Sequence, residues 1–152
     1  ISLGVALYHR DEIDEAVRCL RRACELAPDS ASAWYNLGEA LKREAYTGEA
    51  IDALRRALAI DSACTPARLQ LSRAQASVGR IDLAVHELRD VLRRDPENAK
   101  AWFGLSNFNT VRFDAEDVGH LRQAYQRGGR TPEEQDMLGF ALAKALAAHG
   151  AY

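Results

Sequence analysis

The sequence has 152 residues, of which 47% are hydrophobic and 28% charged, a composition typical of one folded domain and not of a disordered chain. Its formal net charge of -2 gives no electrostatic reason to expect binding to nucleic acid or to an anionic membrane. No apolar run reaches the roughly 20 residues that a membrane-spanning helix needs, and no secretory signal pattern is found at the start.

One spacing recurs along most of the chain. The pairs Leu3-Gly4 and Leu37-Gly38 are separated by 34 positions, and Leu71-Ser72 and Leu105-Ser106 continue the series. The same interval relates Ala16, Ala50 and Ala84, and also Leu20, Leu54 and Leu88. A fixed period of this size predicts a stack of equivalent units, each too small to bury its own apolar face.

Each unit is predicted to consist of two helices. In the second unit, Trp34, Leu37, Gly38 and Leu41 follow the spacing of an apolar helical stripe. Segments rich in Pro, Asp, Ser and Asn separate the units and supply helix stops and caps. In chain order, the predicted helices cover residues 1–9, 12–26, 31–44, 47–60, 65–78, 81–94, 99–110, 115–127 and 132–149.

The motif "WYNLGEAL" at 34–41, followed by Ala50, Leu54 and Ala57, resembles the tetratricopeptide repeat. The third unit departs from that pattern because Arg68 stands where Trp is usual. The resemblance implies an all-α, right-handed α-solenoid of stacked antiparallel helix pairs, with about nine helices in one domain. The repeats are expected at about 1–30, 31–64, 65–98, 99–130 (degenerate) and 131–152 (a half repeat).

Beyond Leu105 the sequence resembles a second group, the bacterial proteins in which tetratricopeptide repeats precede a sulfotransferase domain. The residues that carry this resemblance are Phe113, Asp114, Pro132, Glu133, Phe140 to Leu142, Lys144 to Leu146, Gly150 and Tyr152. It implies a parent enzyme that uses 3'-phosphoadenosine-5'-phosphosulfate, although no phosphate-binding loop occurs in these residues. Gly150-Ala151-Tyr152 is predicted to be the turn of a fifth unit within a longer protein.

No catalytic, cofactor-binding or metal-binding residues are predicted. His9, His86, His120 and His149 are scattered, and Cys19, Cys24 and Cys64 lack the spacing of a metal site. Three cysteines without a secretory signal indicate reduced thiols and a cytoplasmic protein. The large excess of Arg over Lys indicates a bacterial origin.

The repeat resemblance implies a concave groove lined by the first helix of each unit. Carried over to this sequence, the candidate peptide-binding residues are Tyr35, Glu39, Lys42, Arg43, Leu69, Arg73, Lys100, Phe103 and Asn107. Tyr35, Leu69 and Phe103 would form an apolar row beside basic groups, which suits an acidic peptide with apolar anchors. The alternative interpretation is that these are ordinary exposed or half-buried positions of a solenoid.

A carboxylate clamp of the chaperone-binding type is not predicted. Only Asn36 occupies a clamp position, while Val5, Pro66 and Gln70 hold the others. The leading hypothesis is therefore a protein- or peptide-binding scaffold without catalysis. The alternatives are the accessory arm of a sulfotransferase and a structural role through self-association of the solenoid ends.

Overall fold

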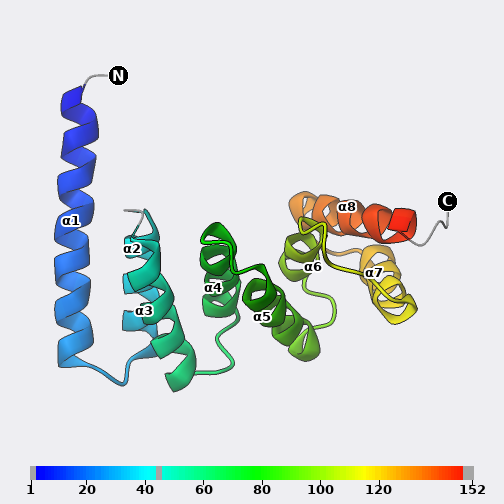
Figure 1. Ribbon diagram of the computed structural model, residues 1–152, viewed down its shortest axis with the longest axis horizontal. Helices are drawn as coiled ribbons and strands as arrows, with labels where there is room; N and C mark the ends of the chain where they lie inside the picture. The colour runs from blue at the N-terminus through cyan, green and yellow to red at the C-terminus, as the bar shows by residue number, and fades with distance from the viewer. Residues whose placement is uncertain (1–2, 44–45, 149–152) are drawn as a thin grey trace. The chain divides into compact units, whose positions relative to one another are not determined.

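The computed structural model describes residues 3–43 and 46–148, with side-chain surroundings given from Glu12 onward. Within these residues the chain folds into eight α-helices and no strand, which confirms the all-α class (Figure 1). The chain divides into two compact units, one of residues 1–80 and one of residues 81–152. The boundary falls inside the predicted repeat 65–98, so the arrangement of the repeats as one domain remains a prediction.

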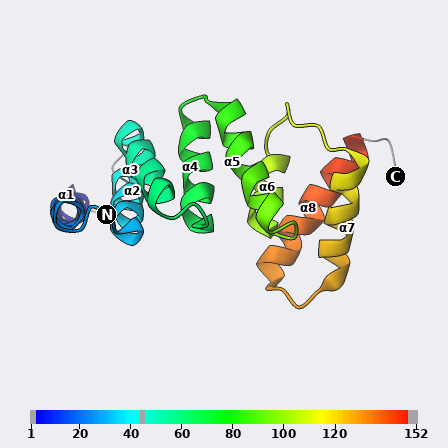
Figure 2. The same ribbon diagram turned by 90° about the horizontal axis from the view of Figure 1, so that it is seen from below.

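The first unit contains four helices, namely α1 (Leu3–Leu26), α2 (Ala31–Arg43), α3 (Thr47–Ile60) and α4 (Thr65–Ser77). The second contains α5 (Ile81–Arg94), α6 (Ala99–Ser106), α7 (Ala115–Arg127) and α8 (Pro132–Ala148). In the second unit α8 packs along both α6 and α7, as the two views of Figures 1 and 2 agree.

Two predicted helix boundaries are wrong. The segments predicted as 1–9 and 12–26 form the single helix α1, so that eight helices replace nine in the described residues. Asp11 lies two periods before Gly79, whose φ of 82° ends the helical path after α4. Asp11 can continue a helix, whereas a left-handed glycine interrupts it. The expected turn at 150–152 lies outside the described residues.

The second error concerns α6, which was predicted to extend to residue 110 and ends at Ser106. Asn107 and Asn109 follow, and Asn favours turns because its side chain competes for backbone hydrogen bonds. The chain then brings Phe113 to a buried position, with its ring 6.3 Å from that of Trp102. Burial of this aromatic side chain favours the early exit from the helix.

The starts of α2, α4 and α6 are each anchored to the preceding turn by one recurring hydrogen bond. The indole Nε1 of Trp34 donates to the carbonyl of Pro28 at 3.0 Å, and that of Trp102 donates to Pro96 at 2.8 Å. In the unit between them, the Arg68 guanidinium donates to the carbonyl of Ser62 at 3.1 Å. Arg68 therefore supplies the N–H donor that Trp supplies elsewhere, which explains how this departure from the repeat pattern is tolerated.

The pair α2 and α3 depends on a close approach at Gly38. A Cβ atom added at Gly38 would lie 2.8 Å from Cγ of Leu54, a side chain with 0% exposure. Leu54 is part of a buried cluster that extends to Ala67, Leu71 and Ala74 of α4. The small residue at the eighth position of the repeat thus sets how closely the helices of this pair pack.

We predict that Gly38→Ala destabilises the protein by about 1–2 kcal/mol, even though Ala favours a helix over Gly by about 1 kcal/mol. The added methyl group would displace Leu54 from a filled core. Gly119→Ala in α7 is the matched control, because a Cβ there meets nothing within 4 Å. That variant should gain about 0.5–1 kcal/mol. Urea denaturation of both variants provides the comparison, and equal shifts would contradict the packing argument.

Candidate functional site

Five of the predicted groove residues lie on α2 and α4 of the first unit. Tyr35, Glu39 and Lys42 lie on α2 and are half-buried, Leu69 on α4 is half-buried, and Arg73 on α4 is exposed. The Lys42 ammonium donates to the side-chain carbonyl of Gln70, which joins the two helices. We call these six residues the basic face of the first unit. Arg43, in the last turn of α2, is exposed beside it.

The electrostatics of the basic face are dominated by two neighbouring cations. Burial and the positive charge of Arg73 lower the pKa of Lys42 from its ordinary value of 10.5, and Glu39 opposes this shift. Burial raises the pKa of Tyr35, with Glu39 and Cys64 adding to the rise and Arg73 opposing it. Among the described residues, Arg73 makes no hydrogen bond or ion pair. The face therefore presents a guanidinium that is free to bind an anionic group.

In the second unit, the predicted residues lie on α6 beside α8. Lys100 is exposed, Phe103 is half-buried, and Asn107 is exposed as the residue that caps the end of α6. The Phe103 ring lies 5.6 Å from that of Phe140, which is 45% exposed. Lys144 has its ammonium 5.4 Å from the Phe140 ring and donates to the Ser106 carbonyl at 2.9 Å.

Gln70, Phe140 and Lys144 were missed as members of these faces. The sequence shows Gln70 only as a residue that does not fit a carboxylate clamp, and in the structure its side-chain carbonyl accepts a hydrogen bond from Lys42. Phe140 and Lys144 belong to the segment whose register departs from 34 residues, so the period could not assign them to a face. The i, i+4 spacing of Phe140 and Lys144 on one helix was the available signal.

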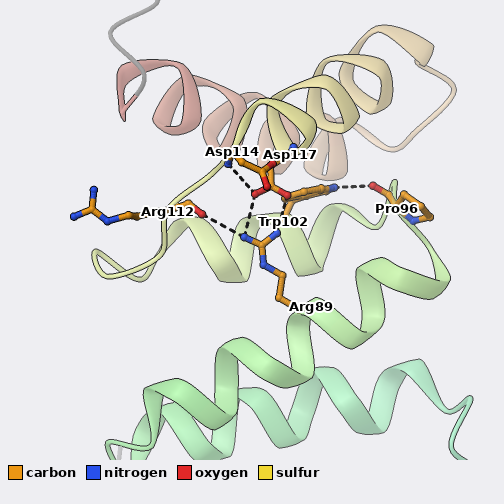
Figure 3. A network of polar contacts seen from close by, with 6 residues as sticks. All are labelled: Arg89, Pro96, Trp102, Arg112, Asp114 and Asp117. Carbon is orange, nitrogen blue, oxygen red and sulfur yellow. Dashed lines mark hydrogen bonds and ion pairs between the residues drawn. The ribbon is translucent and has the colours of Figure 1, made fainter.

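On another face of the second unit, a hollow of about 410 Å³ lies between α5, α7 and the turn before α6. Arg89 forms a two-pronged ion pair with Asp117 at 2.7 and 3.1 Å, and also donates to the Arg112 carbonyl at 3.4 Å (Figure 3). Asp117 in turn accepts from the Asp114 amide at 3.1 Å, while Asp114 accepts from the Asp117 amide at 2.8 Å.

This network of Arg89, Asp114 and Asp117 stabilises the fold and offers no free group for chemistry. Both oxygens of Asp117 are engaged, and the Arg89 guanidinium is held by a carboxylate and a carbonyl. Neither group is left to act as a base, an acid or an anion ligand. The described residues contain no group of His, Cys, Asp or Glu that could hold a metal ion. No helix among them is long and apolar enough to cross a membrane.

The helices recur in pairs, and the starts of α2, α4 and α6 make the same hydrogen bond to the preceding turn. A small residue, Gly38, lies inside the pair α2 and α3. These features define a protein built from helical repeats. Residues 4–44 match the TPR repeat family, and residues 47–106 match the Tetratricopeptide repeat family. Together these matches take in more than half of the chain. The chain is therefore a tetratricopeptide-repeat protein.

Several curated relatives are peroxisomal targeting signal receptors. The receptor of Saccharomyces cerevisiae is 29% identical over 125 residues, which is 82% of this chain and 18% of the receptor. The receptor of Candida albicans is 32% identical over 79 residues, which is 52% of this chain and 13% of the receptor. The chain thus spans less than a fifth of the length of either receptor.

Solved structures of MamA share the fold. A crystal structure of MamA aligns with a TM-score of 0.62 at 23% identity, covering 97% of this chain and 70% of that one. MamA from Desulfovibrio magneticus RS-1 aligns with a TM-score of 0.64 at 16% identity, covering 98% of this chain and 85% of that one. At these identities the likeness establishes the helical-repeat fold alone.

We predict that Asp117→Ala destabilises the protein by about 2–3 kcal/mol, because it leaves Arg89 without its carboxylate and removes half of a capping box. Glu49→Ala is the matched comparison. It removes the partner of Arg21 at the same sequence separation, but that pair is about half exposed and should contribute less than about 1 kcal/mol. Thermal unfolding of both variants measures the difference, and equal losses would show that burial does not determine the strength of these pairs.

Proposed function

We propose that this protein is an interaction scaffold that binds an acidic peptide segment across α2 and α4. Tetratricopeptide repeats support a protein-interaction role in general. The relatives named above are receptors of a targeting signal by name, which is consistent with recognition of a protein segment. The proposal that the peptide binds at the basic face is our own, and it is argued from the residues of the first unit.

One observation carries the proposal. The charges of Lys42 and Arg73 repel each other, and no carboxylate among the described residues forms an ion pair with either of them. Lys42 donates to a neutral amide, and Arg73 makes no hydrogen bond or ion pair with the described residues. Among the described residues, Glu39 is the one carboxylate whose charge acts on both Lys42 and Tyr35. A carboxylate of a partner would replace the repulsion between two cations with charge-assisted hydrogen bonds.

The apolar part of the same face would hold the remainder of the peptide. Tyr35 and Leu69 are both half-buried and belong to adjacent first helices, so each offers part of its side chain to a partner. Apolar anchors between charged contacts are the usual way in which a groove fixes the register of a peptide. Lys100, Phe103 and Asn107, with Phe140, are proposed as a second contact region on α6 and α8.

We further propose that these residues carry no catalysis and that the protein is cytoplasmic. The sulfotransferase alternative finds no support in the receptors and MamA structures named above, and it stays a prediction about a parent protein. Sequencing of the parent gene beyond Tyr152 tests it. A strand followed by a phosphate-binding loop would favour the enzyme, and further 34-residue units would favour the scaffold.

We predict that Lys42→Glu combined with Arg73→Glu weakens binding of an acidic peptide at least about tenfold while the fold is retained. Two oppositely charged contacts would become repulsive, and each is worth about 1 kcal/mol or more when partly desolvated. Fluorescence polarisation with labelled 12-residue peptides that share Leu and Phe but carry either Glu or Lys provides the measurement. The Glu peptide should bind the parent chain, and the Lys peptide should not.

Arg55→Glu is the control for net charge. Arg55 is exposed on α3 in the same unit, so its reversal changes the net charge by the same amount as Arg73→Glu alone and leaves the basic face intact. If this control weakens binding as much as Arg73→Glu alone, long-range attraction accounts for the affinity, and the basic face is not the site. Circular dichroism of each variant verifies that the helices are intact.

We also predict that affinity for the Glu peptide decreases at alkaline pH. The pKa of Lys42 is lowered in the folded protein, and only the protonated amine attracts a carboxylate. The contribution of Lys42 to peptide affinity is therefore complete at pH values below its lowered pKa and is lost as the pH rises through that pKa. This loss begins at a lower pH than for a lysine with the ordinary pKa of 10.5. Lys42→Arg should remove this pH dependence, since a guanidinium stays charged. A Lys42→Arg variant that titrates like the parent chain would contradict the assignment.

A further inference from the structure

The basic face holds more hydrogen-bond donors than one carboxylate can use. Lys42 gives one of its N–H groups to the side-chain carbonyl of Gln70, and the others remain available. Because an ammonium can only donate, this bond fixes the Gln70 amide with its oxygen toward Lys42 and leaves the NH2 group to donate elsewhere. Among the described residues, neither that NH2 group nor the Arg73 guanidinium has a hydrogen-bond partner.

The Tyr35 hydroxyl adds a further donor to the basic face. Burial raises the pKa of Tyr35, so the hydroxyl keeps its proton at neutral pH. It makes no hydrogen bond with the described residues, and it is not a buried atom that lacks a partner. Gln70 and Arg73 are three residues apart on α4, and the charge of Arg73 acts on both Tyr35 and Lys42 of α2. The four donors therefore lie on one surface that spans the two helices.

The charges around these donors leave an excess of two. Lys42 and Arg73 are both positive and repel each other. Glu39 opposes this repulsion, but Arg43 follows it at the i, i+4 spacing and offsets its charge. Three cations and one carboxylate thus leave two positive charges to be balanced. A carboxylate of a partner would balance one of them, whereas a phosphomonoester carries a charge of about −1.5 to −2 at pH 7 and has three acceptor oxygens.

We propose that the acidic residue bound by the basic face is a phosphorylated side chain of the peptide. This inference rests on the proposed function and narrows its ligand. Lys42 and Arg73 would bind the phosphoryl oxygens from α2 and α4, while Gln70 and Tyr35 supply neutral donors. The half-buried Leu69 and the ring of Tyr35 extend the same surface with apolar contacts that a small free anion would not use. A peptide is therefore the source of the phosphoryl group that fits the whole face.

Fluorescence polarisation with three labelled peptides tests the proposal. The peptides share Leu and Phe and differ at one position, which is Ser, Glu or phosphoserine. At neutral pH the phosphoserine peptide should bind at least about tenfold more tightly than the Glu peptide, and the Ser peptide should bind most weakly. Equal affinities of the phosphoserine and Glu peptides would overturn the phosphoryl inference and leave the acidic-peptide proposal standing. Absence of binding by both peptides would overturn the two together.

The second ionisation of the phosphate provides a readout that depends on the dianion itself. Its pKa is about 6, so the peptide gains its second negative charge between about pH 5 and pH 7. The affinity of the phosphoserine peptide should rise several-fold over this range, and a flat profile would contradict the inference. The Glu peptide, whose carboxyl has a pKa of about 4.3, controls for titration of the protein. The titratable and charged groups that it controls for are Tyr35, Glu39, Lys42 and Arg43 of α2 with Cys64 and Arg73 at α4.

Gln70→Glu is the variant that tests the donors directly. The new carboxylate would accept from Lys42 in place of the amide oxygen, balance its charge and remove the NH2 donor. The preference for phosphoserine over Glu should therefore fall at least about tenfold. Ala59→Glu is the matched control, because Ala59 is exposed on α3 of the same unit and the change in net charge is equal. A Gln70→Glu variant that keeps the full preference, with its helices intact by circular dichroism, would overturn the inference.

Competition with inorganic phosphate separates the two sources of a phosphoryl group. Inorganic phosphate should displace the phosphoserine peptide only at concentrations at least about a hundredfold above the Kd of that peptide, because it makes none of the apolar contacts. Displacement at concentrations close to that Kd would identify a free phosphate compound as the ligand and overturn the assignment to a peptide.

Discussion

The hydrogen bond from the start of α2, α4 and α6 to the preceding turn is the contact on which the geometry of these repeats depends. It joins residues six apart at Trp34, Arg68 and Trp102, three positions related by the 34-residue period. It satisfies a carbonyl near the end of one unit and fixes the direction in which the next helix leaves. An indole and a guanidinium share little in shape, but each has an N–H donor at sufficient reach. This position of the repeat therefore requires an N–H donor and does not require an aromatic ring.

A second contact repeats with the same period, and its strength depends on burial. Arg21 pairs with Glu49 and Arg89 pairs with Asp117, each across 28 residues. The side chains of the first pair are 50% and 54% exposed, whereas Asp117 is 11% exposed. Position 83 would hold the acid for Arg55 but is Leu. An ion pair at this register is therefore optional in the repeat, and it becomes important where it also caps a helix.

The sequence was sufficient to predict most of the fold, because the period places the same local signals at the same positions. Helices α3, α5 and α7 begin and end where they were expected. The errors fall where a local signal is replaced, with Asp11 in the place of a glycine and Asn107 followed by a buried Phe113. The periodic pattern predicted that Lys42 and Arg73 share a face, but it could not predict Gln70 as the partner of Lys42 or Phe140 as the neighbour of Phe103. Those contacts depend on side-chain reach between helices, which a period does not encode.

A charged side chain that already has a hydrogen-bond or ion-pair partner is a poor site for binding another protein, and this limits where the scaffold can bind a partner. Arg89, Arg127 and Lys144 are all engaged, by Asp117, Glu97 and the Ser106 carbonyl. A partner that bound them would first have to displace an existing contact, and most of the gain would be lost. Arg73 has no such contact with the described residues, and the charge of Lys42 is disfavoured in the free protein by burial and by Arg73. An anionic group there would form new contacts and relieve an existing repulsion at once, which is the combination that gives a surface both affinity and a preference for acidic segments.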